Sequence, residues 1–554
     1  MSAPPCLIFE DEHLLVVNKP PGWNTHSPAP FAGEGIYDWL RHREPRWERL
    51  AIVHRLDKET SGVLVFGKSP EANRSLTKQF TDHTIVKNYV LLTDRAVNQP
   101  AFIVTTNIAR AGDHYASRPV GERAETRFRL CNSEFGIRTS EFRMVEAEPV
   151  TGRTHQIRVH AGESGFPVLG DTLYGGTPFP RVCLHARSLT LRHPASCETM
   201  TFQAPVDFAE DARLALRRAH IEPEATDAVR LIHGAPDGWS GWYVERLGSW
   251  LLSQSAQSLT ERQKELLASW LKVFDLAGAF HKRLGRDVRG AKTEDASPWP
   301  VFGETRPDEV IVRENGVQFA LRFDEGYSVG LFLDQRDNRR RLLTRHVAAA
   351  FEDVFRVPCS VNSKAAAQTQ ITEHGARSTA APKVLNTFSY TCAFSVCAAL
   401  VGARVTSVDL SKKYLEWGRR NFALNGLDAA AHEFLHGDVF EWLRRLAKKQ
   451  RRFDVILLDP PTFSRSKEHG AFQAEKDFGQ LVAGALPLLE QDGVLFCSTN
   501  AATLEPEKFL EMISAAVSRG GRVIREQHYV PQPPDFPVTR DEPAYLKTVW
   551  MRVR

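Results

Sequence analysis

The sequence predicts three folded parts: a β-rich α+β domain at residues 1–215, a small β-rich domain at 227–325, and an α/β domain at 326–554. Two observations predict this order. Short strand patterns bounded by turn residues dominate the first two parts. In the last part, strand patterns alternate with helical patterns, which is typical of a parallel sheet covered by helices. The 554 residues are enough for several domains of ordinary size.

Few helical patterns interrupt the strands of the first two parts. In the first part, strand patterns lie at 7–17, 62–67, 85–93 and 140–148. Proline and charged residues at 204–225 then indicate a helical connector that leads out of the first domain. In the second part, an amphipathic helix is predicted at 260–273, among further strands.

The third part contains a segment of different composition before its regular alternation begins. Residues 357–382 have few large apolar side chains and much Ala, Ser, Thr and Gln, so we expect a flexible insertion there. After it, strands are predicted at 384–388, 403–410, 453–461 and 493–499. Helices are predicted at 393–401, 411–425 and 472–489.

Composition excludes several classes of protein. The formal net charge of +4 is too small to indicate a polyanionic partner by itself. The eight cysteines form no CxxC pair and no zinc-finger spacing with histidine, so we expect reduced thiols and no metal site. The N-terminus lacks a secretory signal pattern, and no apolar stretch is long enough to span a bilayer. We therefore expect a cytoplasmic protein with no membrane partner.

Two motifs in the first part bring charged side chains next to apolar strands. His54-Arg55-Leu56-Asp57, followed by Thr60-Ser61-Gly62, has the composition of a catalytic loop. Residues 152–160, GRTHQIRVH, are predicted as a strand with Thr154, Gln156 and Arg158 on one side, where they could hold an anion or a nucleic acid. The alternative interpretation of each motif alone is a salt-bridged loop and a basic exposed strand.

Taken together, these motifs resemble those of the RluA-type pseudouridine synthases. HRLDKETSG, GRTHQIRVH, the pair Leu169-Gly170-Asp171 and Tyr174-Gly175, and Leu184-His185-Ala186 occur in the order typical of that family, over nearly all of residues 1–210. The resemblance implies that Asp57 is the catalytic carboxylate, acting on the bond between ribose and uracil. It also implies that this half requires no cofactor and no metal.

Three further residues follow from the same resemblance. A fixed cation is needed to keep the Asp57 carboxylate ionised and oriented, and Arg158 is our candidate. Tyr89, in a Lys-x-Tyr strand, is expected to stack on the uracil or act as a base. Arg55 is expected to contact RNA by filling the space left by a flipped uridine, the alternative being a simple ion pair with Asp57. Residues 18–22 resemble the family's NKPxG segment, whose prolines rigidify a loop beside the site.

Acidic residues in the third part follow the ends of predicted strands. Asp409 lies about 20 positions after the turn at Tyr390, a spacing at which a carboxylate can accept hydrogen bonds from ribose hydroxyls. With Asp438 and Asp459-Pro460-Pro461, this set resembles the S-adenosylmethionine site of Rossmann-like class I methyltransferases. The cofactor-binding residues implied by the resemblance are Phe388, Tyr390, Asp409, Asp438, Asp459, Pro460 and Pro461.

A narrower resemblance concerns the substrate. NTFSYT, VDLSKKYLEWGRRNFALNGL and LDPPTFSRSK, with residues 330–336, resemble large-subunit rRNA methyltransferases, both the RlmK-type guanine-N7 and the RlmI-type cytosine-C5 enzymes. The implied partner is RNA, with rRNA favoured, tRNA possible for the first site, and no DNA. Residues 227–325 resemble the small domain that precedes the catalytic fold in these enzymes, and we expect them to position RNA.

The nature of the methyl acceptor can be argued from residue types. Carbon-5 of cytosine is a weak nucleophile, so its methylation needs a cysteine thiolate that first adds to the ring, whereas guanine N7 has a lone pair. The RlmI-type cysteine position is Asn500 here, and Cys497 is expected inside the strand. We therefore favour guanine N7, with Asn500 contacting the base edge; a plain polar strand end is the alternative.

Two alternative functions stay open at this point. Cytosine-C5 methylation is one of them. The other is a ribosome-assembly or RNA-binding factor with an inactive methyltransferase half, because Cys392 stands where the family usually has glycine and the backbone must approach the cofactor.

Overall fold

The computed structural model describes residues 3–131, 141–284, 297–303, 307–325, 328–355, 381–466, 470–539 and 542–554. The chain forms two compact units. The first comprises Met1–Pro28, Glu34–Arg41 and Arg46–Glu222, and the second Ala29–Gly33, His42–Pro45 and Pro223–Arg554. Among the described residues, no helix combines the length and the apolar character needed to cross a bilayer.

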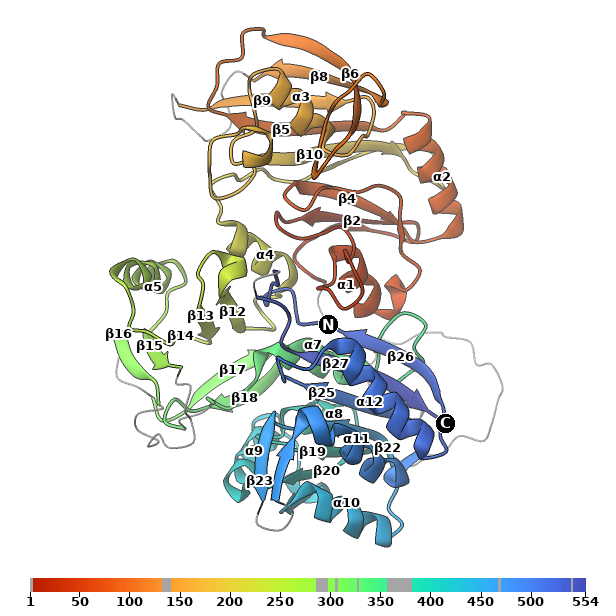
Figure 1. Ribbon diagram of the computed structural model, residues 1–554, viewed down its shortest axis with the longest axis vertical. Helices are drawn as coiled ribbons and strands as arrows, with labels where there is room; N and C mark the ends of the chain where they lie inside the picture. Colours follow the sequence, from red (N-terminus) through yellow and green to blue (C-terminus); the bar gives the residue numbers. More distant parts are fainter. Residues whose placement is uncertain are drawn as a thin grey trace. The chain divides into compact units, whose positions relative to one another are not determined.

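One large mixed sheet organises the first unit (Figure 1). Its described strands run in the order β1-β2-β4-β10-β5-β9-β8-β6-β7, with β11 added beside β10 and β3 beside β4. The strands are β1 (Leu7–Glu10), β2 (Leu14–Lys19), β3 (Ala51–Ile52), β4 (Ser61–Gly67), β5 (Val86–Thr93), β6 (Ala101–Ala111), β7 (His114–Ser117), β8 (Glu122–Leu130), β9 (Arg143–Pro149), β10 (Leu184–Arg192) and β11 (Thr199–Gln203). The helices are α1 (Ile36–Arg43), α2 (Pro70–Thr81), α3 (Gln156–Glu163) and α4 (Ala212–His220).

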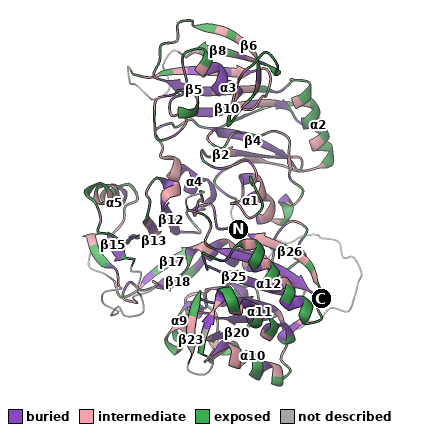
Figure 2. Cartoon of the chain, viewed as in Figure 1, coloured by how far each residue is buried: buried purple, intermediate pink, exposed green. Residues whose placement is uncertain are grey.

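Strands β2 and β4 are apolar on both faces because each face is covered by a helix. Leu14 and Val16 of β2 pack in one cluster with Leu76 of α2, whereas Leu15 and Val17 pack in another with Trp39 of α1. Figure 2 shows β4 as buried throughout and β2 as buried over most of its length. These two strands therefore form a rigid base for the loop that precedes β4.

The strand predicted at 152–160 is wrong: residues from Gln156 onward form helix α3. Over so few residues, alternating polar and apolar side chains do not distinguish a strand from a helix that is buried on most of its surface. The contacts have helical spacing, because Gln156 and His160 both hydrogen-bond the hydroxyl of Thr126, at 2.9 and 2.8 Å. Ile157 and Ala161 pack into the core of the first unit.

The second unit contains the α/β sheet that the alternating patterns predict (Figure 1). The described strands run in the order β21-β20-β19-β22-β25-β27-β26; those from β21 to β25 are parallel, and β27 is antiparallel to both neighbours. They are β19 (Lys383–Thr387), β20 (Arg404–Asp409), β21 (Glu433–His436), β22 (Phe453–Leu458), β25 (Leu489–Thr499), β26 (Ile524–Val530) and β27 (Lys547–Val553). The helices are α7 (Arg336–Thr344), α8 (Ala393–Leu400), α9 (Lys412–Leu424), α10 (Val439–Lys448), α11 (Ala474–Ala485) and α12 (Pro506–Arg519), and β23 (Phe463–Ser466) pairs with β24 (Gly470–Gln473).

A smaller mixed sheet precedes this α/β sheet in the same unit. Its described strands are β12 (Ala228–His233), β13 (Trp242–Leu247), β14 (Trp250–Ser255), β15 (Gly278–Arg283) and β16 (Trp299–Gly303), with α5 at Glu261–Val273. The hairpin β17 (Val310–Glu314) and β18 (Val317–Leu321) follows. Trp417 of α9 donates its indole N–H to the carbonyl of Ala320 in this hairpin, at 2.9 Å. The hairpin thus packs on helix α9 of the α/β domain.

The domain limits given above stay predictions, although the compact units divide at a nearby position. Helix α4 passes through the expected boundary at 215, and the first unit continues to Glu222. The flexible insertion expected at 357–382 lies outside the described residues, except for Ala381 and Pro382.

Candidate active sites

The loop that carries Asp57 is held in place on both sides of that residue. The Thr25 hydroxyl donates to the carbonyl of Leu56 at 2.8 Å and accepts the Leu56 N–H at 3.2 Å. On the other side, the carbonyl of Lys58 accepts from the Lys19 ammonium at 3.1 Å and from the Gly22 N–H at 2.8 Å. The NKPPG segment therefore fixes the Asp57 loop through hydrogen bonds from Lys19 and Gly22.

Lys19 is fully buried and donates two further hydrogen bonds, to the carbonyls of Pro20 at 3.0 Å and Trp23 at 2.7 Å. Burial lowers its pKa to about 7, against the opposing charges of Glu59 and Asp57. An amine that bonds only carbonyl oxygens organises backbone. We therefore regard Lys19 as a support of the loop.

Asp57 faces two nitrogen groups from the GRTHQIR motif. Its Oδ2 lies 3.7 Å from Arg158 Nη1 and 3.9 Å from His155 Nε2. Burial raises the pKa of the Asp57 carboxyl, while the charges of His155 and Arg158 lower it in part. The arrangement keeps a basic carboxylate next to a fixed cation.

Arg158 is held rigidly by a second carboxylate. Its Nε and Nη2 donate to the two oxygens of Asp171 at 2.6 and 2.8 Å, a bidentate pair in which the two side chains are 4% and 1% exposed. Burial lowers the pKa of Arg158, but the bonds to Asp171 outweigh it and raise that pKa above its ordinary value. The remaining Nη1 is buried without a hydrogen bond among the described residues, and it lies 3.5 Å from Glu59 Oε2 and 3.7 Å from Asp57 Oδ2.

Tyr89 reaches the same site from a neighbouring strand. It is paired in register with Ala186 of β10, and Ala186 is paired with Gly62 of β4, which follows the Asp57 loop. A side chain at Gly62 would meet the Ala186 carbonyl at 2.2 Å, so this close approach of strands requires glycine. Burial and the charge of Asp57 raise the pKa of Tyr89, which keeps its phenol protonated at neutral pH.

The first two residues of the HRLD motif have different roles. Arg55 is exposed, and among the described residues it makes no hydrogen bond or ion pair, so the alternative of an Arg55–Asp57 pair does not hold. His54 is structural: its ring stacks on Phe80, and its Nε2 accepts the N–H of Val65 at 3.0 Å.

In the second unit, Asp409 contacts the turn at Tyr390. Asp409, at the end of β20, accepts the N–H of Tyr390 at 2.8 Å and that of Ser411 at 2.8 Å. Burial raises the pKa of Asp409, and these bonds lower it in part. Each oxygen keeps a free lone pair, so the carboxylate fits the ribose hydroxyls of a nucleoside cofactor.

The turn after β19 has an unusual backbone. Phe388, Tyr390 and Cys392 all have positive φ, at 52°, 47° and 62°. Side chains rarely adopt this conformation, and it persists only where surrounding contacts enforce it. Here it brings the Tyr390 N–H onto Asp409 and leaves the turn at the carboxyl ends of the parallel strands, where such sheets bind ligands.

Asp459 follows β22 and contacts residues that the sequence did not single out as site residues. Gln335 Nε2 lies 3.3 Å from both Asp459 oxygens and donates to the Ser498 hydroxyl at 2.8 Å. Burial raises the pKa of Asp459 to about 6, with a contribution from the charge of Asp334. Asp334 accepts a hydrogen bond from the Tyr545 hydroxyl at 2.9 Å, and its other oxygen is buried without a partner.

The other predicted residues of the second unit follow the ends of β21, β22 and β25. Asp438 follows β21 and accepts the Glu441 N–H at 3.1 Å as the N-cap of α10, so its side chain supports the helix. Pro460 is buried and Pro461 exposed. Asn500, after β25, accepts a hydrogen bond from the Thr462 hydroxyl at 2.6 Å, which joins it to the segment following Asp459.

Cys392 fits into a space left by a glycine on another helix. A side chain at Gly418 of α9 would meet the Cys392 sulfur at 2.4 Å and its Cβ at 2.9 Å. The thiol is fully buried and thus packs against α9. This packing removes the reason to expect that the larger residue obstructs the cofactor site.

The other described cysteines of the second unit are also buried. Cys497 lies inside β25, and burial raises its pKa well above the ordinary value. Burial raises the pKa of Cys392 to about 12, and that of Cys397 rises as well. Within the described residues of this unit, no thiol is therefore ready to act as a thiolate nucleophile.

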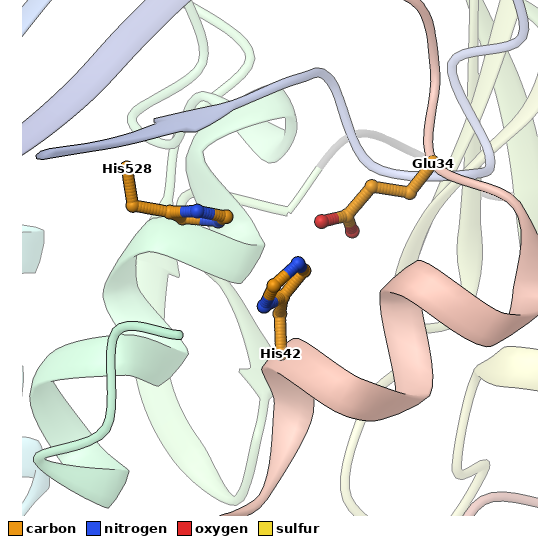
Figure 3. A group of neighbouring side chains, drawn as sticks. All are labelled: Glu34, His42 and His528. Carbon is orange, nitrogen blue, oxygen red and sulfur yellow. The ribbon is translucent and has the colours of Figure 1, made fainter. Parts of the chain in front are cut away.

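Figure 3 shows two histidines of the second unit, His42 and His528, whose ring centroids are 4.4 Å apart. Burial lowers the pKa of His528 well below its ordinary value, and His42, Arg341 and His346 lower it further. The third labelled side chain, Glu34, belongs to the first unit. We assign no metal site to these side chains.

Comparison with known families agrees with the two predicted enzyme domains. The chain matches the RNA pseudouridylate synthase family over residues 13–163 and the S-adenosylmethionine-dependent methyltransferase family over residues 370–552. It therefore carries the domains of two enzymes, a pseudouridine synthase and a methyltransferase.

Curated relatives agree with the methyltransferase assignment. The putative ribosomal RNA large subunit methyltransferase YwbD of Bacillus subtilis is 34% identical over 338 residues, which cover 60% of this chain and 76% of that protein. Ribosomal RNA large subunit methyltransferase I of Klebsiella pneumoniae (strain 342) is 30% identical, over 74% of this chain and 92% of that protein. The chain belongs to this family of ribosomal RNA large-subunit methyltransferases. The solved human RNA pseudouridylate synthase domain containing 4 is 25% identical, covering 38% of this chain and 92% of that chain, with a TM-score of 0.30.

Proposed function

We propose that the protein is a bifunctional RNA-modifying enzyme, which converts uridine to pseudouridine in RNA and methylates large-subunit rRNA with S-adenosylmethionine. The convergence of Arg158 and His155 on Asp57 carries the first assignment. The bonding of Asp409 to the Tyr390 turn carries the second. A cytoplasmic location is part of the proposal, and cell fractionation tests it.

In the first site, Asp57 attacks or deprotonates the ribose next to the glycosidic bond. If Asp57 attacks C1′, an ester bond forms as the N1–C1′ bond breaks, and the ester bond breaks when C5 of the rotated uracil bonds to C1′. If Asp57 instead removes the C2′ proton as N1–C1′ breaks, it returns that proton to C2′ when C5 bonds to C1′. In either route the C5 proton leaves and N1 gains a proton. Arg158 keeps the carboxylate ionised. Tyr89 stacks on the uracil, since its raised pKa favours a neutral phenol over a proton acceptor. Arg55, exposed beside Asp57, occupies the space of the flipped nucleotide.

The test for the first site uses the full chain and RNA from cells that lack the gene. The RNA is labelled with tritium at uridine C5, so each pseudouridine formed releases tritium. We expect Asp57→Asn to abolish the release while methyl transfer to the same RNA continues. Tritium release by Asp57→Asn at the wild-type rate would contradict the assignment of Asp57.

In the second site, Asp409 would hold the ribose of the cofactor, and Phe388, Tyr390 and the segment 459–461 would surround its remainder. S-adenosylmethionine supplies an electrophilic methyl group on sulfonium. We expect Asp409→Ala in the full chain to abolish the binding heat of S-adenosylmethionine in calorimetry. No saturable heat from the wild-type protein would instead support an inactive methyltransferase half.

For the methyl acceptor we favour guanine N7 over cytosine C5. The described cysteines of this unit are buried with raised pKa values, and Asn500 stands at the strand end. A lone pair at N7 needs no thiolate, whereas cytosine C5 does. Nucleoside mass spectrometry of large-subunit rRNA from cells with and without the gene tests this preference. Loss of 7-methylguanosine is expected, and loss of 5-methylcytidine would contradict the proposal.

A further inference from the structure

His155 faces the carboxylate of Asp57, although it is not among the site residues predicted above. It has a positive φ of 56° and precedes helix α3. Its Nδ1 lies 2.8 Å from the Tyr174 hydroxyl, and its Nε2 lies 3.9 Å from Asp57 Oδ2. Because this backbone conformation is costly for a side-chain-bearing residue, the surrounding contacts hold the imidazole in a specific place.

The hydrogen bonds around Tyr174 determine where the imidazole proton lies. The Tyr174 hydroxyl accepts the N–H of Tyr115 at 3.1 Å. Burial raises the pKa of Tyr174, so its hydroxyl keeps a proton to donate. Among the described residues, His155 Nδ1 is the acceptor available to that proton. The imidazole proton is then on Nε2, which points toward Asp57.

We propose that His155 is a positioning residue: together with Arg158 Nη1, its neutral Nε2–H holds Oδ2 of Asp57, so that Oδ1 is the oxygen that reacts with the ribose. Both donors converge on Oδ2, at 3.9 and 3.7 Å. Within the described part of the chain, neither Asp57 oxygen accepts a hydrogen bond, and Oδ2 is the oxygen nearest to both donors. Such contacts are often long without substrate and shorten in the reacting complex.

A neutral donor suits this position better than a second cation. The groups that act on His155 are Asp57, Arg158, Glu59 and Asp171, and the ring also contacts Tyr174 and Tyr115. Burial lowers the pKa of His155, against the raising effect of Asp57. Since Arg158 already supplies a positive charge, an added imidazolium would lower the pKa of Asp57 and make it a weaker base and nucleophile.

The inference rests on the proposed role of Asp57, and substitutions at 155 and 174 in the full chain test it. Glutamine places an amide N–H near the position of Nε2 and has no tautomers, whereas asparagine places its amide near Nδ1. With tritium-labelled uridine RNA, we expect His155→Ala and His155→Asn to lower kcat about 100-fold with little change in KM. We expect His155→Gln to restore most of the rate.

Tyr174→Phe supplies the matched control, because it keeps the ring that stacks on Arg158 at 5.1 Å and removes only the hydroxyl. We expect it to lower kcat about 10-fold in the wild-type background, the worth of one hydrogen bond. In the His155→Gln background we expect no further loss, because no tautomer remains to be fixed. Tyr174→Phe also removes the hydrogen bond from the Tyr115 N–H. If that loss alone lowered the rate, the rate would fall by the same factor in both backgrounds.

Different outcomes overturn different parts of the proposal. An inactive His155→Gln, or a fully active His155→Ala, would overturn the positioning role. An equal effect of Tyr174→Phe in both backgrounds would overturn the tautomer argument. A fully active Asp57→Asn would instead overturn the proposed site itself. Methyl transfer by the second unit reports, in each variant, that the chain is produced, and the calorimetric transition of the first unit, compared with that of the wild type, reports that its fold is kept.

Discussion

At the residue scale, buried carboxylates in both units are kept basic by their surroundings. Asp57 and Asp459 have pKa values raised mainly by burial, and each has a neighbouring carboxylate, Glu59 or Asp334, that raises them further. Arg158 contacts the carboxylate of Asp57 and Gln335 that of Asp459, and these contacts reduce the free-energy cost of ionising the buried groups. Perturbed carboxyl groups of this kind cluster at catalytic sites, because the structure tolerates their cost where function needs them.

The raised pKa of Asp459 predicts a pH-dependent stability. Its folded pKa of about 6 lies above the unfolded value of 3.8, so its ionisation makes the folded state less stable as the pH rises through this interval. We expect Asp459→Asn to raise the melting temperature at pH 8, because it removes an ionisation cost of roughly 3 kcal/mol, and to leave it nearly unchanged near pH 4. Calorimetric scans across this range test the prediction, and an equal shift at both pH values would contradict it.

At the element scale, one close contact joins the start of α8 to α9. The Cys392 thiol, at the start of α8, occupies the space in front of Gly418 of α9. A glycine inside a helix costs roughly 1 kcal/mol relative to alanine, and here the close contact explains it. The family glycine that Cys392 replaces would leave this space empty.

This contact predicts a compensating pair of substitutions. Gly418→Ala should destabilise the second unit by about 1 to 3 kcal/mol, because its Cβ would overlap the sulfur of Cys392. Adding Cys392→Gly should restore stability, since glycine removes the sulfur and suits the positive φ of 62° at that position. Denaturant unfolding of the four proteins in this cycle measures the coupling. Additive costs would show that the contact does not decide stability.

At the scale of the whole molecule, two units with separate cores carry separate sites. Asp57, Tyr89 and Arg158 all belong to the first unit, and Asp409 and Asp459 to the second. Nothing in the proposed chemistry of one site requires a residue of the other. The chain therefore combines two modification activities that a mutation can remove one at a time.

This separation predicts a selective effect of cofactor. S-adenosylmethionine at 100 times its dissociation constant should stabilise the second unit by about 2.7 kcal/mol. We expect calorimetry to show two transitions, of which the cofactor shifts one, and Asp409→Ala to remove the shift. A single transition that moves as a whole would show that the two units unfold together.

The sequence by itself determined the classes of fold, the two enzyme domains and the order of their motifs. Strand and helix periods, and motifs such as HRLD and DPPTF, are local properties, so they can be seen without coordinates. The place of Asp409 at the end of a strand also followed from sequence spacing, whereas its hydrogen bond with the Tyr390 N–H came from the structure.

Only the tertiary structure decided which side chains act on the reacting groups. The strand predicted at 152–160 is largely the helix α3, because burial on most of its surface hides the helical period. His155, Asp171 and Lys19 lie in motifs that the sequence displays, but their contacts with Asp57, Arg158 and Lys58 join residues far apart in the chain. The fit of Cys392 against Gly418 likewise depends on how closely α9 approaches the start of α8. Sequence periodicity carries no information about such distances, because they depend on how packed elements meet.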